Sequence, residues 1–245
     1  MGKTKGLLCF AVCMALASAS PVFAAEEKKA FSDEGELSYV QTSGNTEVTT
    51  LAAKNQAKYR FTESILGTWK AGALYSKTSG TTTAENYFTD LKLDYQNTAR
   101  LYSFVNAGWM RDRFTGVDER LYGGLGEGCK FLDGPHNFLV GEVSLLYVSD
   151  RYVNDTRKSY LSGRAFAKYT YAFTEKDKFS QSVEYLHNFE DAKNYVVNSE
   201  TAVIASLTSI FSLKSAYVVK YVNEPVPDTL KKTDSMLTVA LVVNY

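Results

Sequence analysis

The sequence predicts an all-β protein: a transmembrane antiparallel up-and-down β-barrel of about 12 strands. Three observations predict it. Apolar and polar side chains alternate along successive segments of about ten to fifteen residues, as in strands whose two faces meet different surroundings. Short and longer connections alternate between these segments. The last segment, residues 233–245, places Leu237, Leu241 and Tyr245 on one face and stops on that aromatic side chain.

The first residues are typical of a secretory signal peptide. Lys3 and Lys5 precede an apolar run at 7–17, and Val22-Phe23-Ala24 is a small-residue cleavage pattern. A membrane anchor is the alternative, but the run is shorter than the roughly 20 residues that a spanning helix needs. The predicted organisation is therefore a signal peptide at 1–24, a short periplasmic N-terminal segment at 25–34, and the barrel at 35–245.

Composition argues against several classes of function. Removing residues 1–24 leaves Cys129 as the only thiol, so no intramolecular disulfide is expected. The remaining chain has two more acidic than basic residues, which gives no electrostatic basis for binding nucleic acid. No histidine pair stands at ligand spacing, so neither a metal nor a cofactor is expected.

The alternation predicts twelve strands, at 36–41, 49–61, 65–76, 87–95, 101–112, 119–131, 138–149, 158–172, 178–189, 197–207, 211–222 and 233–245. The tight connections at 62–64, 96–97, 133–136 and 174–177 are predicted to face the periplasm. The longer ones at 77–86, 112–118, 150–157, 190–196 and 223–233 are predicted to lie outside the cell.

The aromatic residues favour a membrane barrel over a soluble β-sandwich or a lipocalin-like cup. A soluble core built from the apolar faces would have to accommodate Trp69, Trp109 and many tyrosines. Along the predicted outward face the aromatic residues instead gather near both ends of the strands. Two such rings are what the two interfaces of a bilayer select.

The segment from Gly123 to Gly128 has glycine at alternate positions within a predicted strand. A phosphate-binding loop needs a following helix, so these glycines are instead expected to make room for large inward side chains. Strict alternation from Leu125 turns Glu127 towards lipid. We therefore expect a bulge among Gly123 to Gly128 that turns Glu127 inward or gives its carboxylate a partner.

Charged residues share the predicted inward face of the strands. The candidate lumen-lining residues are Lys54, Lys58, Lys70, Lys92, Arg120, Arg164, Lys168, Glu142, Glu184 and Glu200. Two hypotheses follow: a lumen closed by paired charges, or a narrow pore that favours anions. A barrel of about twelve strands lies between small filled barrels and open porins, so size leaves both open.

Two further groups of residues are candidates for function. Asp112 and Arg113 are predicted at the outer rim, where they could contact a solute or lipopolysaccharide or simply form a salt bridge. His187 near an outer strand end raises the alternative of a lipid-modifying outer-membrane enzyme. However, Phe189 stands two residues on, where such an enzyme would place a serine, and a triad is defined by geometry.

Several runs resemble a known family: Gly35-Glu36-Leu37-Ser38-Tyr39, Thr42-Ser43-Gly44-Asn45-Thr46, Arg111-Asp112-Arg113-Phe114, Arg120 and Gly123-Gly124-Leu125-Gly126. In their order and spacing the chain resembles the salt-induced outer-membrane proteins, labelled domain of unknown function 481. The resemblance implies an outer-membrane β-barrel and an association with salt response. It implies no reaction, ligand or catalytic residue.

We therefore expect a monomer that is exported by the general secretion route and acts without catalysis in the outer membrane. Its function would be that of a narrow solute pore or of an envelope or salt-stress component. The expected partners are outer-membrane lipid, lipopolysaccharide and, during insertion, the barrel-assembly machinery. Tyr245 is the expected insertion signal.

Overall fold

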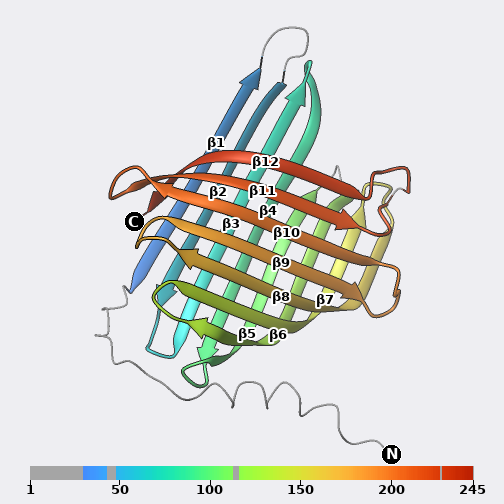
Figure 1. Cartoon of the computed structure of the whole chain (residues 1–245). Helices are drawn as coiled ribbons and strands as arrows, with labels where there is room; N and C mark the ends of the chain where they lie inside the picture. Colours follow the sequence, from blue (N-terminus) through green and yellow to red (C-terminus); the bar gives the residue numbers. More distant parts are fainter. Residues whose placement is uncertain (1–29, 43–47, 113–115, 227, 245) are drawn as a thin grey trace, which may run out of the picture.

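The computed structural model describes residues 30–42, 48–112, 116–226 and 228–244, which form a closed antiparallel barrel (Figure 1). Its strands are β1 (Phe31–Thr42), β2 (Val48–Arg60), β3 (Ile65–Thr78), β4 (Thr81–Gln96), β5 (Leu101–Asp112), β6 (Val117–Asp133), β7 (Asn137–Tyr152), β8 (Arg157–Ala172), β9 (Lys178–Asn188), β10 (Tyr195–Ser206), β11 (Phe211–Val222) and β12 (Thr233–Asn244). Each strand pairs with its neighbours in the sequence, and β12 closes against β1. The predicted up-and-down barrel is confirmed. The signal peptide, Arg113 and Tyr245 lie outside the described residues.

The outer face of the barrel is apolar. Leu125 and Leu237 have relative exposures of 63% and 69%, and other large apolar side chains are exposed along the strands. The alternate positions of β7 and β11 are buried and include polar residues such as Glu142 and Lys214. A face of this kind is stable against hydrocarbon and not against water. The described part of the chain contains no helix long and apolar enough to cross a membrane.

We call the end where β1 begins and β12 finishes the terminal end, and the other the loop end. A threonine recurs in four of the turns at the terminal end. The hydroxyls of Thr62, Thr98, Thr174 and Thr208 each accept a hydrogen bond from the backbone N–H three residues later, at 2.9 to 3.1 Å. This local hydrogen bond stabilises a tight turn instead of further pairing between the strands, so the chain reverses within a few residues.

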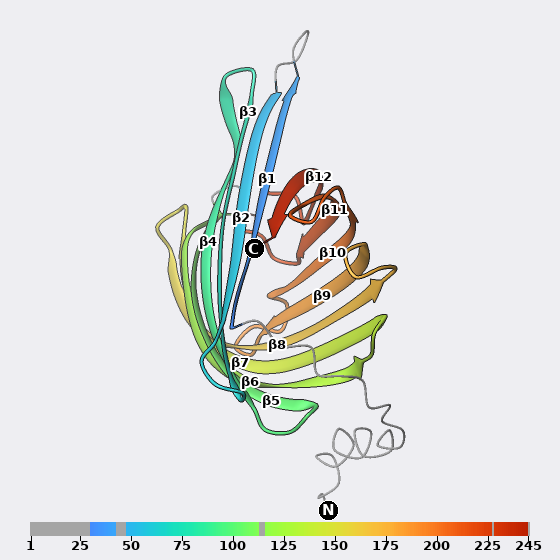
Figure 2. The same ribbon diagram turned by 90° about the vertical axis from the view of Figure 1, so that its left-hand side faces the viewer.

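The predicted loop at 77–86 is wrong. β3 runs to Thr78 and β4 starts at Thr81, joined by Ser79 and Gly80, whose φ angles of 48° and 80° are those of a tight hairpin turn. The β-branched threonines at 81–83 favour strand, which explains the extension. Likewise β1 begins at Phe31, earlier than the predicted strand at 36–41. The early start of β1 adds to the barrel where the chain termini lie, whereas the long β3–β4 hairpin is at the opposite end, where β1 to β4 project beyond the other strands (Figure 2).

The predicted bulge between Gly123 and Gly128 is also wrong. β6 pairs without a shift from Arg120 to Lys130 on β7, and the irregularities lie beyond these residues on either side. Glu127 stays on the outer face, where its carboxylate accepts a 2.8 Å hydrogen bond from the Ser103 hydroxyl. Ser103 is close to the terminal end of β5, where water can reach the pair, so no bulge is needed to solvate it. Arg120 and Lys130 keep their inward positions.

The alternate glycines of β6 make room for aromatic side chains, as predicted. A Cβ atom at Gly126 would overlap the ring of Phe104, and one at Gly128 would overlap the ring of Tyr102. Both rings point into the barrel and are buried. The interior next to β6 is therefore filled by side chains, and Leu146, Val148 and Tyr160 form an apolar cluster beside it.

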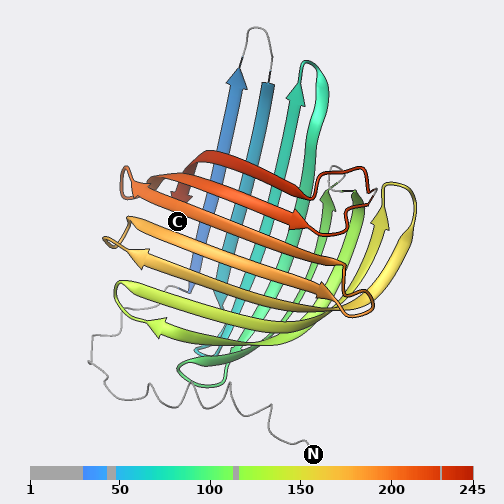
Figure 3. The ribbon, with the colours of Figure 1, turned by 45° about the vertical axis from the view of Figure 1, so that its right-hand side comes forward.

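The closure between β1 and β12 is short. Only four residue pairs join these strands in the described chain, from Glu34–Asn244 to Leu37–Leu241, whereas every other neighbouring pair of strands has at least ten. We call this junction the seam. Beyond the seam, β1 continues in the same direction as β2, β3 and β4, while β12 turns away together with β11. The two walls of the barrel therefore cross at a steep angle (Figure 3).

Candidate functional site

The ten candidate lumen-lining residues come from eight strands. Lys54 and Lys58 lie on β2, Lys70 on β3, Lys92 on β4, Arg120 on β6, Glu142 on β7, Arg164 and Lys168 on β8, Glu184 on β9 and Glu200 on β10. Seven of them belong to ion-pair networks within the barrel, and three do not. No local sequence pattern predicts which of these charges are paired. The three unpaired side chains determine which charge a solute in the interior would meet.

A central network is organised around Glu142, which is 8% exposed. Its Oε1 accepts hydrogen bonds from Lys92 Nζ and from the Tyr102 hydroxyl, the latter at 2.7 Å. Its Oε2 accepts one from Arg164 Nη1 at 2.9 Å. Because Lys92 on β4 and Glu142 on β7 are not on neighbouring strands, this contact passes through the interior. Because Lys92 and Arg164 share the single negative charge of Glu142, each of them also bonds to a second carboxylate.

Arg164 and Lys92 each reach a second carboxylate. Arg164 Nε donates to Glu184 Oε1, and Glu184 Oε2 accepts from Asn198 Nδ2 at 2.9 Å. Lys92 Nζ also lies 2.9 Å from Asp94 Oδ1 and 4.3 Å from the centre of the Phe104 ring. The network thus runs from β4 to β10 with three carboxylates against two cations, and its side chains occupy this side of the lumen.

Arg120 forms a separate pair nearer the loop end. Its Nε and Nη2 donate to both oxygens of Asp150, at 2.6 and 2.7 Å, and the Asp150 side chain is fully buried. The hydroxyls of Tyr152 and Tyr160 donate to the same carboxylate. Asp150 was expected within the loop at 150–157, yet β7 continues to Tyr152. Extending the alternating pattern of this strand from Val148 to Asp150 would have predicted that Asp150 faces inward.

A third group lies on the wall that includes the seam. Lys214 on β11 bonds to Glu36 on β1 at 2.7 Å and to Glu200 on β10 at 3.1 Å. Lys54 is 3.9 Å from the other oxygen of Glu200 and keeps 41% of its side chain exposed. Lys54 is thus only weakly paired. Glu36 was not among the candidate lumen residues, although it occupies an alternate position in the first strand.

Lys58, Lys70 and Lys168 form what we call the lysine cluster. Within the described residues none of them has an ion pair or a hydrogen bond, and all three side chains are exposed to open space. Their charges act on one another, Lys58 with both Lys70 and Lys168, and the carboxylates of Glu34 and Glu200 act on Lys168 from beyond ion-pair distance. These lysines come from different parts of the barrel wall, β2 and β3 against β8, and place three positive charges in the interior. Like charges held together attract mobile anions.

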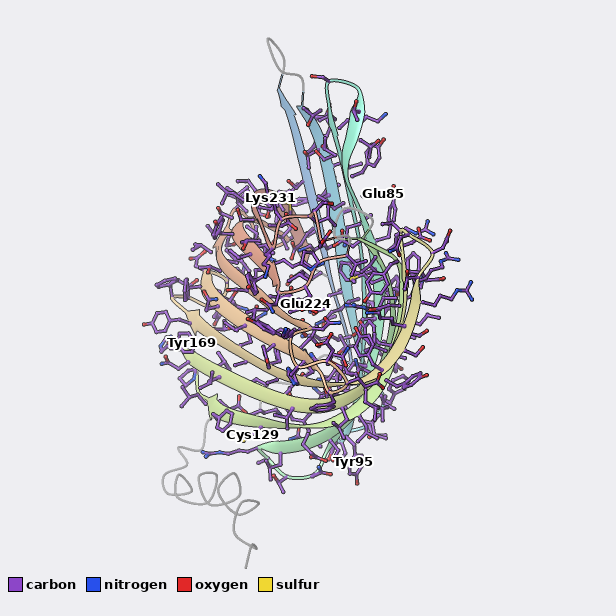
Figure 4. All side chains as sticks on the ribbon, turned by 90° about the vertical axis from the view of Figure 1, so that its right-hand side faces the viewer. Glu85, Tyr95, Cys129, Tyr169, Glu224 and Lys231 are labelled. Atoms are coloured by element: carbon purple, nitrogen blue, oxygen red, sulfur yellow. The ribbon has the colours of Figure 1, made fainter. Side chains whose placement is uncertain are left out.

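The mouth at the loop end is bridged. The β5–β6 and β11–β12 connections are half a turn apart in the strand order, yet the Lys220 ammonium on β11 bonds to Asp112 on β5 at 2.8 Å. Between β11 and β12 the backbone carbonyl of Val226 lies against Gly116, and Pro225 is buried. Figure 4 looks onto this end and shows Glu224 near the middle of the mouth. Asp112, an outer-rim candidate, therefore spans the opening together with Lys220.

In the part of the chain that the structure describes, neither histidine ring is hydrogen-bonded to a serine hydroxyl. The ring Nδ1 of His187 lies 3.1 Å from the Tyr185 hydroxyl, and the ring stacks on Tyr185 and meets Phe189 edge-on. The nearby Ser162 hydroxyl donates instead to the backbone carbonyl of His187. His136 in its turn bonds to the carbonyl of Ala172. Among the residues that the structure describes, no three potential ligands gather as a metal site would require.

Comparison with known proteins connects this geometry to a family. An uncharacterised Escherichia coli K12 protein, YdiY, is 28% identical over 222 residues, 89% of this chain and 84% of that protein. The outer-membrane channel COG4313 from Pseudomonas putida F1 is 11% identical with a TM-score of 0.57, covering 92% of this chain and 100% of that one. The NanC porin has a TM-score of 0.48 at 8% identity, covering 88% and 98%.

These similarities bear on fold and lineage. The P. putida channel shares the barrel architecture, and its identity is too low to transfer a solute. A family model described as "Protein of unknown function, DUF481" matches residues 35–245. That description says nothing about salt. The chain belongs to the DUF481 family.

Proposed function

We propose that this protein is a narrow outer-membrane channel that favours small anions and works without catalysis. The observation that carries the proposal is the lysine cluster: Lys58, Lys70 and Lys168 face open space without a carboxylate partner, while most other interior charges are paired. Paired charges contribute little net potential. The three unpaired ammonium groups therefore set the sign of the field along the passage.

The arrangement of the interior supports a route for solutes along one wall. The central network and the aromatic side chains fill the space beside β4 to β9. Towards the loop end a cavity of about 590 Å3 is lined by residues that include Lys54 and Lys220. A small anion would pass from this cavity by Lys54 to the lysine cluster and leave at the terminal end. The bridged mouth excludes larger solutes.

The cellular setting belongs to the same proposal. After export by the general secretion route and removal of residues 1–24, the barrel-assembly machinery would insert the chain with its terminal end in the periplasm. It would work there as a monomer, in contact with lipid and lipopolysaccharide. The apolar outer face and the tight turns at the terminal end support this placement. An anion pathway of this kind would suit a role in the envelope under salt stress.

Planar-bilayer recording of the purified protein tests the proposal. Under a potassium chloride gradient we expect a small conductance whose reversal potential has the sign for chloride. Absence of conductance from protein shown to be folded, or a reversal potential with the sign for potassium, would overturn it.

A further inference from the structure

Two arginines lie directly opposite each other on the β7–β8 hairpin, which stands at the loop end of the barrel (yellow in Figure 3). They are Arg151 on β7 and Arg157 on β8. Arg151 stands between the buried residues Asp150 and Tyr152, so both arginines are on the outer face of the barrel. Like charges directly opposite each other destabilise a pair of strands. An anion that both arginines can reach would therefore stabilise this hairpin.

The carboxylates beside the pair do not compensate both arginines. Arg151 Nη2 lies 2.8 Å from Asp118 Oδ2 and 3.4 Å from Glu119 Oε2, both on β6. Asp118 is shared with Arg111 on β5, whose Nε is 3.8 Å from Oδ1. Arg157 is exposed, and no carboxylate of the described chain is within ion-pair distance of it. These five side chains thus carry three positive charges against two negative ones.

The two arginines also have hydrogen-bond donors without an acceptor. The N–H at Nε of Arg151 is buried and has no acceptor among the described residues, and no side-chain N–H of Arg157 is bonded to any of them. A guanidinium group presents its N–H groups in a planar fork that fits the oxygens of a phosphate. A phosphate beside Arg157 would balance its charge and give Arg151 Nε an acceptor once that guanidinium turns towards β8.

From the arginines towards the middle of the barrel, the same face of the hairpin changes from charged to apolar. The next register pair is Ser149 and Ser159, whose hydroxyls are 3.1 Å apart and hydrogen-bonded. The following pair is Tyr147 and Leu161, which are 58% and 54% exposed, and Leu145 continues the apolar part. Charged, hydroxyl and apolar groups therefore succeed one another in the order of the phosphate, sugar and acyl chains of a glycolipid. A free phosphate ion would contact only the first of these three zones.

We propose that the outer face of the β7–β8 hairpin binds a phosphorylated glycolipid of the outer leaflet, the class to which lipid A belongs. The phosphate lies between Arg151 and Arg157. The sugar lies against the two serine hydroxyls, and the acyl chains lie along Tyr147 and Leu145. The inference rests on the proposed placement of the loop end outside the cell and is independent of ion conduction.

Native mass spectrometry of the full barrel in detergent micelles tests this site. The probe is lipid A, titrated in parallel with the same lipid from which the phosphates have been removed. We expect Arg157→Gln to weaken the binding of lipid A about tenfold, equivalent to about 1.4 kcal/mol, down to the level of the dephosphorylated lipid. Lys158→Gln is the matched control, because Lys158 is the next residue and points inward, opposite Asp150 in the register. Its binding of lipid A should be unchanged.

Equal losses in the two variants would mean that net charge alone attracts the lipid, which would overturn the site. Displacement of lipid A by inorganic phosphate would overturn the lipid as the occupant, and equally tight binding of phosphatidylglycerol would overturn the phosphorylated sugar. A barrel that binds lipid A through Arg157 but carries no current would refute the channel and leave this site standing. Anion-selective current with equal losses in both variants would refute this site alone.

Discussion

Glu142 shows how many interactions one buried carboxylate can make in this interior. It accepts hydrogen bonds from Lys92, Tyr102 and Arg164 and is almost fully buried. Replacing it with alanine would remove these three hydrogen bonds from a buried site, two of them to charged groups, which costs about 3 kcal/mol even though Lys92 keeps Asp94 and Arg164 keeps Glu184. We expect Glu142→Ala to lower the free energy of unfolding by about that amount in a urea titration of the vesicle-inserted barrel.

Glu127→Ala is the control for this variant. Glu127 is an exposed carboxylate whose hydrogen bond goes to the Ser103 hydroxyl, so its removal should cost about 1 kcal/mol or less. Equal losses in the two variants would mean that the central network does not stabilise the barrel.

Side-chain direction could be predicted residue by residue, but side-chain partners could not. Lys54, Lys58 and Lys70 look alike in the sequence, since each occupies an alternate position of an amphipathic strand. Only the fold brings Lys54 near Glu200, about 150 positions later in the chain, and leaves the other two lysines unpaired. Alternation is a property of one strand, whereas pairing across the interior depends on the tilt and register of the whole sheet.

At the scale of elements, the alternation predicted the tight connections at 62–64, 96–97 and 174–177. The threonines of the terminal-end turns accept local hydrogen bonds and mark four reversals. The segment at 77–86 is polar, as a loop would be, and yet it forms strand. Its threonines extend both strands instead, and the reversal needs only Ser79 and Gly80. The connection that bridges the mouth could not be foreseen, because its contact at Gly116 comes from the opposite wall.

Gly116 allows this connection to close the mouth. Its φ is 89°, and a Cβ atom there would collide with the carbonyl of Val226. Gly116→Ala should therefore lift the β11–β12 connection and raise the single-channel conductance. Gly80→Ala is a matched control, since Gly80 has a φ of 80° but nothing near its missing Cβ. Both changes introduce similar backbone strain, about 1–2 kcal/mol, so only the conductance separates them. An unchanged conductance in Gly116→Ala would mean that the connection does not obstruct the pore.

For the molecule as a whole, the two ends of the barrel give a prediction about sides. Cysteine placed at Gly80 or Asp155, at the loop end, should react with an impermeant maleimide on intact cells in a Cys129→Ser background. Cysteine at Gly134, in a turn at the terminal end, should react only after the outer membrane is opened. Reaction at Gly134 alone on intact cells would reverse the orientation.

The architecture of the whole molecule followed from the sequence because twelve amphipathic strands with an apolar outer face have few other ways to fold in a bilayer. The short pairing at the seam could not be predicted from the sequence. β1 and β12 have the same alternation as the other strands, and the length of their pairing depends on how the first and last strands meet after the other ten are in place. The sequence therefore indicates closure but not how much of the closing edge is paired.

The most direct test of the proposed channel is the reversal potential of a barrel with an inverted lysine cluster. With Lys58, Lys70 and Lys168 all replaced by glutamate, the sign of the reversal potential in a potassium chloride gradient should change from that of chloride to that of potassium. Glutamate at the exposed Lys176, Lys193 and Lys231, which lie in turns and loops, changes the net charge equally and should leave the reversal potential as it was. If the two variants shift it equally, or if the lumen variant keeps the selectivity of the unmodified barrel, the lysine cluster does not govern permeation.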